Sequence, residues 1–248
     1  MTQGRTALVT GGMGSLGEAT AKALHDAGNT VLVTYFPSHE QPEEWLARTK
    51  SEGYDFQAYP VDVADFESCK ACAEKVFADG HQVDILVNNA GITRDASLGK
   101  LDKDNWDAVL RTNLDSVFNM TKLFYGPMLE RRWGRVVNIS SVNGSKGAFG
   151  QTNYSAAKAG IYGFTKALAL EVAKKGVTVN AVSPGYLDTP MVRQVPEDVL
   201  NTKVIPEIPM GRLGQPSEIA ALVTFICSEP AGFMTGANVA MNGGQHMY

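Results

Sequence analysis

The sequence contains few cysteines and no long apolar stretch. Its 248 residues include three cysteines, an odd number that cannot form a closed set of disulfides, so a reducing compartment is expected. No uninterrupted apolar run approaches the roughly 18 residues that a membrane-spanning helix needs. The chain also runs from Met1 directly into the strand-like segment Thr6–Thr10, without the apolar stretch of a signal peptide. These absences predict a cytoplasmic, soluble protein that does not interact with a membrane.

Positive charge is also scarce. Lysine and arginine number 22 against 26 aspartates and glutamates, which gives a net charge of −4 at pH 7. A protein that binds nucleic acid through its phosphates usually carries the opposite sign. Hydrophobic residues make up 44% and charged residues 19%, a balance that excludes a largely disordered chain or a coiled coil. We therefore expect a globular protein without a nucleic-acid partner.

The cysteines and histidines do not form a metal-binding motif. Cys69 and Cys72 have the C-x-x-C spacing, but both fall in the predicted helix Asp65–Ala78, and Cys227 stands alone. Zinc needs four ligands, or three and a water, and the four histidines show no ligand spacing. Buried thiols are the simpler interpretation, so we expect no metal site.

Short β-rich segments alternate with longer helical patterns along the whole chain. Strands separated by helices predict parallel pairing through right-handed crossovers. Several of the strands are apolar on both faces, which is typical of a sheet covered by helices on both sides. Since no linker or repeat divides the chain, we expect one α/β domain over residues 1–248, with a doubly wound, seven-stranded parallel sheet. The predicted strands are Thr6–Thr10, Thr30–Thr34, Phe56–Val61, Val83–Val87, Val136–Ser140, Val177–Val182 and Ala237–Met241.

A glycine-rich turn follows the first predicted strand. The residues from Gly11 to Gly17 connect it to a helical pattern from Glu18 to Ala27. Glycines at such a junction let the backbone approach a pyrophosphate, and the helix N-terminus offers free N–H groups and the positive end of its dipole. A tight turn without a ligand is the alternative. The strand before and the helix after the turn favour a nucleotide site.

A second group of polar residues lies later in the chain. Tyr154 and Lys158 are four residues apart at the start of a predicted helix, so their side chains share one face. Ser141 follows the fifth predicted strand, at the carboxyl end where open parallel sheets bind ligands. Asn113 lies on the buried stripe of a long predicted helix, Asp104–Glu130, where a hydrogen-bonded core amide is the alternative interpretation.

Taken together, these motifs resemble those of the short-chain dehydrogenase/reductase family. The family's four catalytic positions are matched in order and spacing by Asn113, Ser141, Tyr154 and Lys158. In the glycine turn Gly11 and Gly17 match, whereas Ser15 stands where the middle glycine is usual. The resemblance implies a Rossmann fold and an oxidoreductase with a nicotinamide cofactor. Further matches are Asn88-Asn89-Ala90-Gly91, Pro184-Gly185 and the ending Asn242-Gly243-Gly244.

The resemblance also implies a chemical role for each catalytic position. Hydride transfer to a ketone creates an alkoxide that needs a proton, and tyrosine, with a pKa near 10, is a weak acid at neutral pH. Because Lys158 and the oxidised nicotinamide are positively charged, we expect them to lower the pKa of Tyr154. Ser141 would hydrogen-bond the substrate oxygen. Lys158 would also hold the nicotinamide ribose, and Asn113 would anchor a water chain that reloads the proton.

The choice between NADH and NADPH depends on the end of the second strand. Family members that prefer NAD often carry an acidic residue there, and those that prefer NADP often carry a basic one. This chain has neither. Lys22 is the only lysine or arginine between Thr6 and Ala47, and three glutamates follow the strand, Glu40, Glu43 and Glu44. A 2′-phosphate would find little charge-assisted pairing there, so NADH is favoured over NADPH. The implied cofactor-binding residues are Gly11, Met13, Ser15, Leu16, Gly17, Tyr35, Asp62, Val63, Asn89, Ala90, Gly91, Tyr154, Lys158, Pro184 and Gly185.

The substrate is indicated by the segment from Asn138 to Tyr154, which is similar to that of acetoacetyl-CoA reductases of polyhydroxyalkanoate (polyhydroxybutyrate) synthesis. This similarity implies acetoacetyl-CoA as substrate and (R)-3-hydroxybutyryl-CoA as product. Two alternatives stay open. One is a 3-oxoacyl-[acyl-carrier-protein] reductase of fatty-acid synthesis, whose acidic carrier would meet the basic pairs Arg131-Arg132 and Lys174-Lys175. The other is a dinucleotide-binding module without catalysis.

Residues close to the catalytic positions in sequence are candidates for the substrate site. The segment Tyr186–Pro209 contains four prolines and is predicted to be a long loop with little regular structure that acts as a lid. The family resemblance further implies a homotetramer joined through the helices Asp104–Glu130 and Asn153–Lys174 and the last strand. The predicted substrate contacts are Arg94, Asn143, Phe149, Gln151 and Tyr186.

Overall fold

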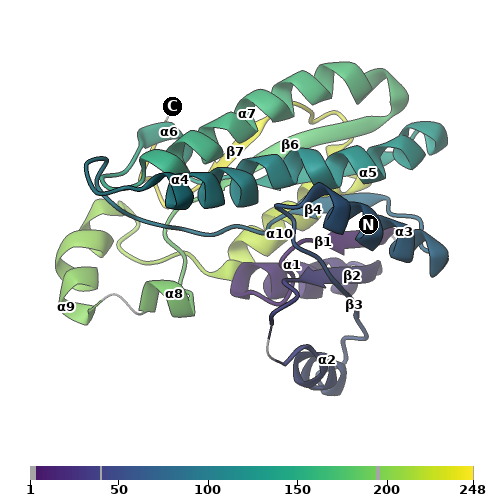
Figure 1. Ribbon diagram of the computed structural model, residues 1–248, viewed down its shortest axis with the longest axis horizontal. Coiled ribbons are helices and arrows are strands. Elements are labelled where there is room, and N and C mark those ends of the chain that lie inside the picture. The colour runs from purple at the N-terminus through teal and green to yellow at the C-terminus, as the bar shows by residue number, and fades with distance from the viewer. Residues whose placement is uncertain (1–3, 40, 194–195, 248) are drawn as a thin grey trace.

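The computed structural model describes residues 4–39, 41–193 and 196–247. They form one seven-stranded sheet in which all neighbouring strands are parallel, in the order β3-β2-β1-β4-β5-β6-β7 (Figure 1). Strand order runs outward from β1 in both directions, so the sheet is doubly wound. The predicted fold class and all seven predicted strands are confirmed. The strands are β1 (Thr6–Val9), β2 (Thr30–Tyr35), β3 (Gln57–Pro60), β4 (Ile85–Asn88), β5 (Gly134–Ile139), β6 (Val177–Pro184) and β7 (Asn238–Met241).

Helices cover both faces of this sheet. One face packs against α3 (Phe66–Ala78), α5 (Ser116–Arg131) and α7 (Thr152–Val172). The other packs against α1 (Ser15–Asp26), α2 (Pro42–Ser51) and α10 (Pro216–Cys227). Figure 1 shows α5 and α7 above the sheet and α1 and α2 below it.

The apolar runs in the strands follow from this two-sided burial. On β1, the Leu8 side chain packs toward α3, α5 and α7, whereas Ala7 and Val9 pack toward α1 and α10. All three side chains are completely buried. Because successive strand residues point to opposite faces, a strand between two helical layers can be apolar at successive positions.

The long predicted helix Asp104–Glu130 is interrupted in the structure. Helix α4 (Lys103–Leu110) continues into a π-helical turn, η1 (Arg111–Asp115), before α5 begins. A π-helical turn accommodates one extra residue, and such turns are frequent at functional sites. The buried stripe continues across it, so apolar periodicity alone gave no sign of it. The turn contains Asn113.

The segment between β6 and α10 is more regular than predicted. It contains four short helices: α8 (Pro190–Arg193), α9 (Glu197–Val199), η3 (Leu200–Val204) and η4 (Ile205–Glu207). Gln194 and Val195, within the predicted lid, lie outside the described residues. The expectation of little regular structure was wrong because Pro190, Pro196 and Pro206 stand at or next to helix starts, where a missing N–H group costs nothing.

The cysteines are free thiols in the helical layers. Cys69 and Cys72 are buried in α3 and Cys227 is buried in α10. Burial raises the pKa of the Cys69 thiol to about 12 and that of the Cys72 thiol to about 11. In the described part of the chain, no group of three or more potential metal ligands occurs. Within the same residues, no helix combines the length and apolar character needed to cross a bilayer.

Candidate active site

The predicted site residues follow neighbouring strands at one edge of the sheet. Strands β1, β4, β5 and β6 are adjacent and parallel, so their carboxyl ends lie together. The glycine turn follows β1, Asn89 follows β4, Ser141 follows β5 and Gly185 follows β6. The structure therefore brings the nucleotide motif and the polar residues to the edge where doubly wound sheets bind their ligands.

Two glycines where β1 passes into α1 have no room for a side chain. A Cβ atom on Gly12 would lie 2.5 Å from Cβ of Val33, and one on Gly17 would lie 2.3 Å from the carbonyl oxygen of Gly11. Gly11 has a φ of +61°, in the left-handed region that favours glycine. Helix α1 begins without a side-chain cap. A close backbone approach in front of an uncapped helix N-terminus fits the pyrophosphate of a dinucleotide.

Asn89 fastens this turn to the end of β4. Its side-chain amide donates to the carbonyl oxygens of Thr10 at 2.9 Å and Gly11 at 3.3 Å. The Thr10 hydroxyl in turn accepts from the backbone N–H groups of Asn89 at 2.9 Å and Ala90 at 3.0 Å. Two predicted cofactor segments therefore form one hydrogen-bonded unit. Sequence reasoning missed Thr10, although its place directly before the glycine turn was a usable signal.

Other predicted cofactor residues surround this unit. Ser15 is exposed at the first position of α1, whereas Met13 and Leu16 pack partly into the core. The Asp62 carboxylate accepts from the backbone of Ala64 at 3.0 Å in a local turn. Val63 is buried, and its carbonyl oxygen accepts from the Asn119 side-chain amide at 3.0 Å.

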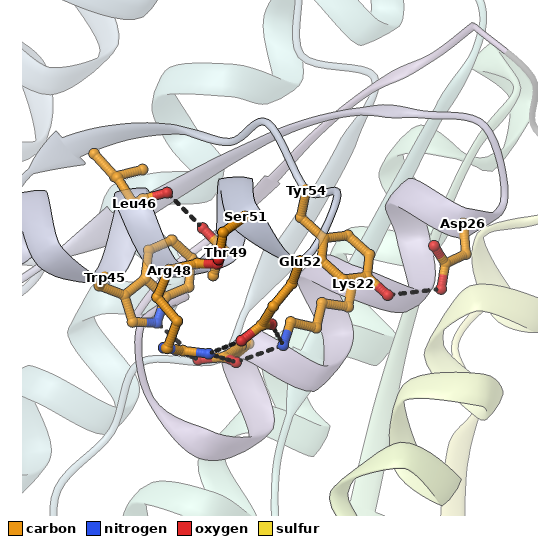
Figure 2. A network of polar contacts seen from close by, with 10 residues as sticks. Lys22, Asp26, Trp45, Leu46, Arg48, Thr49, Ser51, Glu52 and Tyr54 are labelled. Carbon is orange, nitrogen blue, oxygen red and sulfur yellow. Dashed lines mark hydrogen bonds and ion pairs between the residues drawn. The ribbon is translucent and has the colours of Figure 1, made fainter.

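The cations between α1 and α2 are already paired. Figure 2 shows Lys22 and Arg48 gathered around the Glu52 carboxylate, between α1 and α2. Lys22 Nζ lies 2.8 Å from Glu18 and 2.6 Å from Glu52, and Arg48 lies 2.6 Å from Glu18 and 3.0 Å from Glu52. Burial alone would raise the pKa of Glu18, but hydrogen bonds from Arg48 and Lys22 lower it to about 2. Glu40, named in the cofactor prediction, lies outside the described residues.

Ser141, Tyr154 and Lys158 come together at the start of α7. The Lys158 ammonium lies 5.5 Å from the centroid of the Tyr154 ring and donates to the backbone carbonyl of Ile139 at 2.8 Å. The Ser141 side chain hydrogen-bonds Tyr154. Lys158 and Ser141 are both buried. The spacing in the sequence therefore correctly predicted that these three side chains lie close together.

The electrostatics of this group differ from the sequence expectation. Burial raises the pKa of Tyr154 to about 12, although the hydrogen bond with Ser141 lowers it. Burial also lowers the pKa of Lys158 to about 8. In the chain without a cofactor, the loss of hydration therefore outweighs the interactions that lower the pKa of Tyr154. The negative charge of the Asp95 carboxylate also raises the pKa of Tyr154.

Asn113 supports the loop that follows β4. Its side-chain oxygen accepts from the Ile92 N–H at 3.1 Å, and its side-chain nitrogen donates to the carbonyls of Ile92 and Val109, both at 2.9 Å. The amide is 1% exposed. All of its contacts are with the backbone, so the side chain acts as a brace between the π-helical turn and the loop. The expected link between Asn113 and a water chain stays a prediction.

Gly91 marks the point where these elements converge. A Cβ atom at this residue would lie 2.5 Å from Asn113 Oδ1 and 3.6 Å from Lys158 Nζ. The loop after β4, the π-helical turn and α7 therefore meet within a few ångströms.

Among the predicted substrate residues, Asn143 and Gln151 form a chain that leads away from Ser141. The Asn143 N–H donates to Ser141 Oγ at 3.2 Å, and its side-chain nitrogen donates to Gln151 Oε1 at 2.9 Å. Gln151 donates to the Asp95 carboxylate at 2.8 Å. Asn143 Oδ1 is buried and has no hydrogen-bond partner, so it can accept from a ligand. Asp95, which sequence reasoning did not single out, sets the orientation of both amides because a carboxylate only accepts.

The other predicted substrate residues are more scattered. Phe149 is 96% exposed in the loop before α7. Arg94 is exposed and its guanidinium donates to the carbonyl of the adjacent Thr93 at 2.8 Å. Tyr186 is half-buried, and burial raises its pKa. It lines a cavity of about 200 Å³ together with Leu187, Ile208 and other residues of the segment before α10.

Comparisons with known proteins agree with this arrangement. The family described as "Enoyl-(Acyl carrier protein) reductase" matches residues 11–246. An acetoacetyl-CoA reductase of Cupriavidus necator is 53% identical over 247 residues, which cover 100% of both chains. An acetoacetyl-CoA reductase of Shinella zoogloeoides is 51% identical, over 97% of this chain and 98% of the relative. A 3-oxoacyl-[acyl-carrier-protein] reductase of Pseudomonas aeruginosa is 44% identical, over 99% and 98%.

Proposed function

Because the chain belongs to the short-chain dehydrogenase/reductase family, we propose that it reduces the 3-keto group of acetoacetyl-CoA to (R)-3-hydroxybutyryl-CoA for polyhydroxyalkanoate synthesis. The family implies an oxidoreductase with a nicotinamide dinucleotide. Acetoacetyl-CoA reductases with about half of their residues identical over the full chain support the substrate. The observation that carries the proposal is the convergence of Ser141, Tyr154 and Lys158 beside the glycine turn.

The proposed mechanism follows from the protonation of the three groups. The reduced nicotinamide, when bound, supplies the hydride. Tyr154, with a pKa of about 12, is protonated at neutral pH and is therefore ready to donate its proton to the substrate oxygen. Ser141 hydrogen-bonds the same oxygen as negative charge develops on it.

Lys158 and Asn113 would complete the proton transfer. Lys158, with a pKa of about 8, is charged at neutral pH and stabilises the tyrosinate that Tyr154 leaves behind. Lys158 also holds the nicotinamide ribose. We assign Asn113 to the water chain that returns a proton to Tyr154, supported by its place in the π-helical turn beside Lys158.

The test of the proposed function is the variant Tyr154→Phe. It should lose at least about 1,000-fold in kcat with acetoacetyl-CoA, since the proton donor is gone. The dissociation constant for NADH, measured by fluorescence quenching, should stay within about twofold of the wild-type value. Tyr125→Phe, on the outer helix α5, is the matched control and should keep full activity. A Tyr154→Phe protein with most of the wild-type rate would refute the assignment.

We also propose that NADH is the preferred cofactor. Support comes from the cations of α1 and α2, the helices that precede and follow β2 in the chain, because Lys22 and Arg48 are already engaged by Glu18 and Glu52. A 2′-phosphate bound there would have to compete with two carboxylates for each cation. The ratio of kcat/KM for NADH to that for NADPH should exceed one, and a ratio well below one would overturn the preference.

A comparison of kcat/KM for two substrates distinguishes coenzyme A from an acyl-carrier protein as the carrier of the acyl group. The acyl-carrier-protein alternative rests on the 44% identical reductase of Pseudomonas aeruginosa. We expect kcat/KM to be higher with acetoacetyl-CoA than with acetoacetyl-[acyl-carrier-protein]. Strong preference for the protein-bound substrate would favour the alternative. Binding of NADH without reduction of either thioester would instead support a dinucleotide-binding module without catalysis.

We further propose a homotetramer in the cytoplasm, in which each chain acts as one domain. Residues 186–209 would cover the substrate as a lid, and the side chains that would contact it are Arg94, Asn143, Phe149, Gln151 and Tyr186. The tetramer is supported by exposed apolar side chains on the elements expected to join, namely Phe118 on α5, Leu170 on α7 and Met241 on β7. The three buried thiols fit a reducing compartment.

A further inference from the structure

Helix α7 forms hydrogen bonds with three consecutive residues at the end of β5, namely Ile139, Ser140 and Ser141. Lys158 Nζ donates to the carbonyl of Ile139 at 2.8 Å, and the Ser140 hydroxyl donates to the carbonyl of Lys158 at 2.8 Å. One turn further along the helix, the Tyr162 hydroxyl lies 2.7 Å from the carbonyl oxygen of Ser141. Tyr162 therefore continues the face of α7 that carries Tyr154 and Lys158. The mechanism described above gives Tyr162 no role.

The direction of the Tyr162 hydrogen bond is fixed by the available protons. Its hydroxyl also lies 3.0 Å from Ser183 Oγ and 3.1 Å from Ser145 Oγ. A carbonyl oxygen only accepts, so the single phenolic proton goes to Ser141 at the shortest of the three distances. Ser183 gives its own proton to Asn238 Oδ1 at 2.6 Å. The Tyr162 hydroxyl can still accept from Ser145, so it donates one hydrogen bond to Ser141 and accepts one from Ser145.

The backbone around Ser141 leaves space for this contact. The Ser141 carbonyl also accepts from the Gly144 N–H at 3.0 Å, which closes a tight turn at the start of α6 (Asn143–Lys146). A Cβ atom on Gly144 would lie 2.8 Å from the Tyr162 hydroxyl oxygen. Glycine at residue 144 thus lets the turn approach α7 closely enough for Tyr162 to reach the Ser141 carbonyl.

We propose that Tyr162 is a positioning residue for the reduction, which holds the backbone of Ser141 so that the Ser141 hydroxyl stays in contact with Tyr154. This inference rests on the proposed function of Ser141. From one helix, Tyr154 meets the side chain of Ser141 and Tyr162 meets its carbonyl, so both ends of the residue are held by the same rigid element. Without the Tyr162 hydroxyl, the carbonyl keeps only the bond within its own turn, and the side chain can rotate away from the substrate oxygen.

The test compares Tyr162→Phe with Ser183→Ala. The first variant removes the hydrogen bond to Ser141 and the second leaves that bond in place while removing the adjacent hydroxyl. With acetoacetyl-CoA and NADH, Tyr162→Phe should lower kcat about tenfold, equivalent to about 1.4 kcal/mol. KM for NADH should stay within about twofold, because the glycine turn is untouched. Ser183→Ala should keep kcat within about twofold of the wild-type value.

The pH profile separates positioning from a merely structural effect. The hydrogen bond with Ser141 lowers the pKa of Tyr154, whereas the Tyr162 phenol itself raises it. Loss of the phenol alone would therefore move the apparent pKa of (R)-3-hydroxybutyryl-CoA oxidation downward, and only release of Ser141 in Tyr162→Phe would move it upward, as the inference expects. Asp95, Lys158 and Tyr186, which also face Tyr154 or lie near it, are unchanged in the variant. A Tyr162→Phe enzyme with kcat within twofold of wild type and an unshifted profile would overturn the inference.

Hydrogen exchange gives a readout that does not depend on activity. In the NADH-bound protein, the amides of residues 140–146 should exchange at least about fivefold faster in Tyr162→Phe than in the wild type or in Ser183→Ala. If the wild type fails to reduce acetoacetyl-CoA, the proposed function is refuted and this measurement alone decides the inference. Faster exchange in Tyr162→Phe would then support the role of the hydroxyl, and equal exchange in all three proteins would exclude it.

Discussion

At Gly91 the requirement for glycine comes from a neighbouring side chain rather than from backbone conformation. A Cβ atom there would lie 2.5 Å from Asn113 Oδ1, so Gly91→Ala must displace the amide that braces Ile92. We expect a loss of about 1 to 3 kcal/mol in unfolding free energy from overpacking and at least a tenfold fall in kcat. Gly99→Ala is the control, because nothing lies within 4 Å of its Cβ position. Equal behaviour of the two variants in urea denaturation would contradict the steric account.

Lys158 makes the stability of the protein depend on pH in a predictable direction. Its pKa falls from the ordinary 10.5 to about 8 in the folded chain. Between these values the unfolded chain binds a proton that the folded chain has released, so rising pH favours the folded state. The wild type should therefore gain stability relative to Lys158→Met between pH 8 and 10.5, as measured by urea denaturation. With Lys166→Met, an exposed change on the same helix, the difference from wild type should stay constant over this range.

Phe36 offers a way to change the cofactor preference. It directly follows β2 and is 57% exposed, whereas Lys22 and Arg48 are held by carboxylates. Phe36→Arg would place an unpaired guanidinium where a 2′-phosphate is expected, so kcat/KM for NADPH should rise about tenfold. Leu98→Arg, on a distant exposed turn, should leave the ratio between the cofactors unchanged. An unaltered ratio in Phe36→Arg would show that the phosphate lies elsewhere.

The residues of the site were predictable where spacing alone places them. Tyr154 and Lys158 had to share a helix face, and Ser141 had to end a buried strand, whatever surrounds them. Their pKa values were not predictable in this way, because burial by residues distant in the sequence raises one and lowers the other. Asp95 was not predicted as part of the site because its hydrogen-bond partner is also distant in the sequence. Its contact with Gln151 joins two loops that are 56 residues apart.

At the scale of elements, α1 and α2 are joined mainly through charge. Glu18 accepts hydrogen bonds from Lys22, Arg48 and the Trp45 indole. Glu18→Gln should lower the unfolding free energy by about 1 to 2 kcal/mol at pH 7. Because the folded pKa of Glu18 is about 2 and its ordinary value is 4.5, the difference should shrink as pH falls from 4.5 toward 2. Glu67→Gln, which removes only a 4.0 Å contact with Lys70, should have little effect at any of these pH values.

The elements themselves differ in how far the sequence could specify them. All seven strands were predicted because each is flanked by helical patterns and the central strands β1, β4, β5 and β6 are buried along nearly their whole length. The π-helical turn at Asn113 was not, since the apolar stripe repeats on both sides of it and only the pairing of Asn113 with Ile92 distinguishes it. In the segment 186–209, prolines suggested a loop, but proline at a helix start is also compatible with the short helices observed.

At the scale of the whole molecule, the active site and the proposed subunit contacts share one helix. The buried face of α7 carries Lys158, while Leu170 on its outer face is 84% exposed. A solvent-exposed leucine contributes nothing to the stability of a monomer, but its burial between chains contributes about 1.5 to 3 kcal/mol per copy. Leu170→Glu should therefore shift the proposed tetramer toward smaller species in size-exclusion chromatography with light scattering. Leu98→Glu, on an exposed turn outside the expected contacts, should elute as the wild type does. A monomeric wild type would refute the assembly, and α7 would then have to hold its catalytic residues without support from a neighbouring chain.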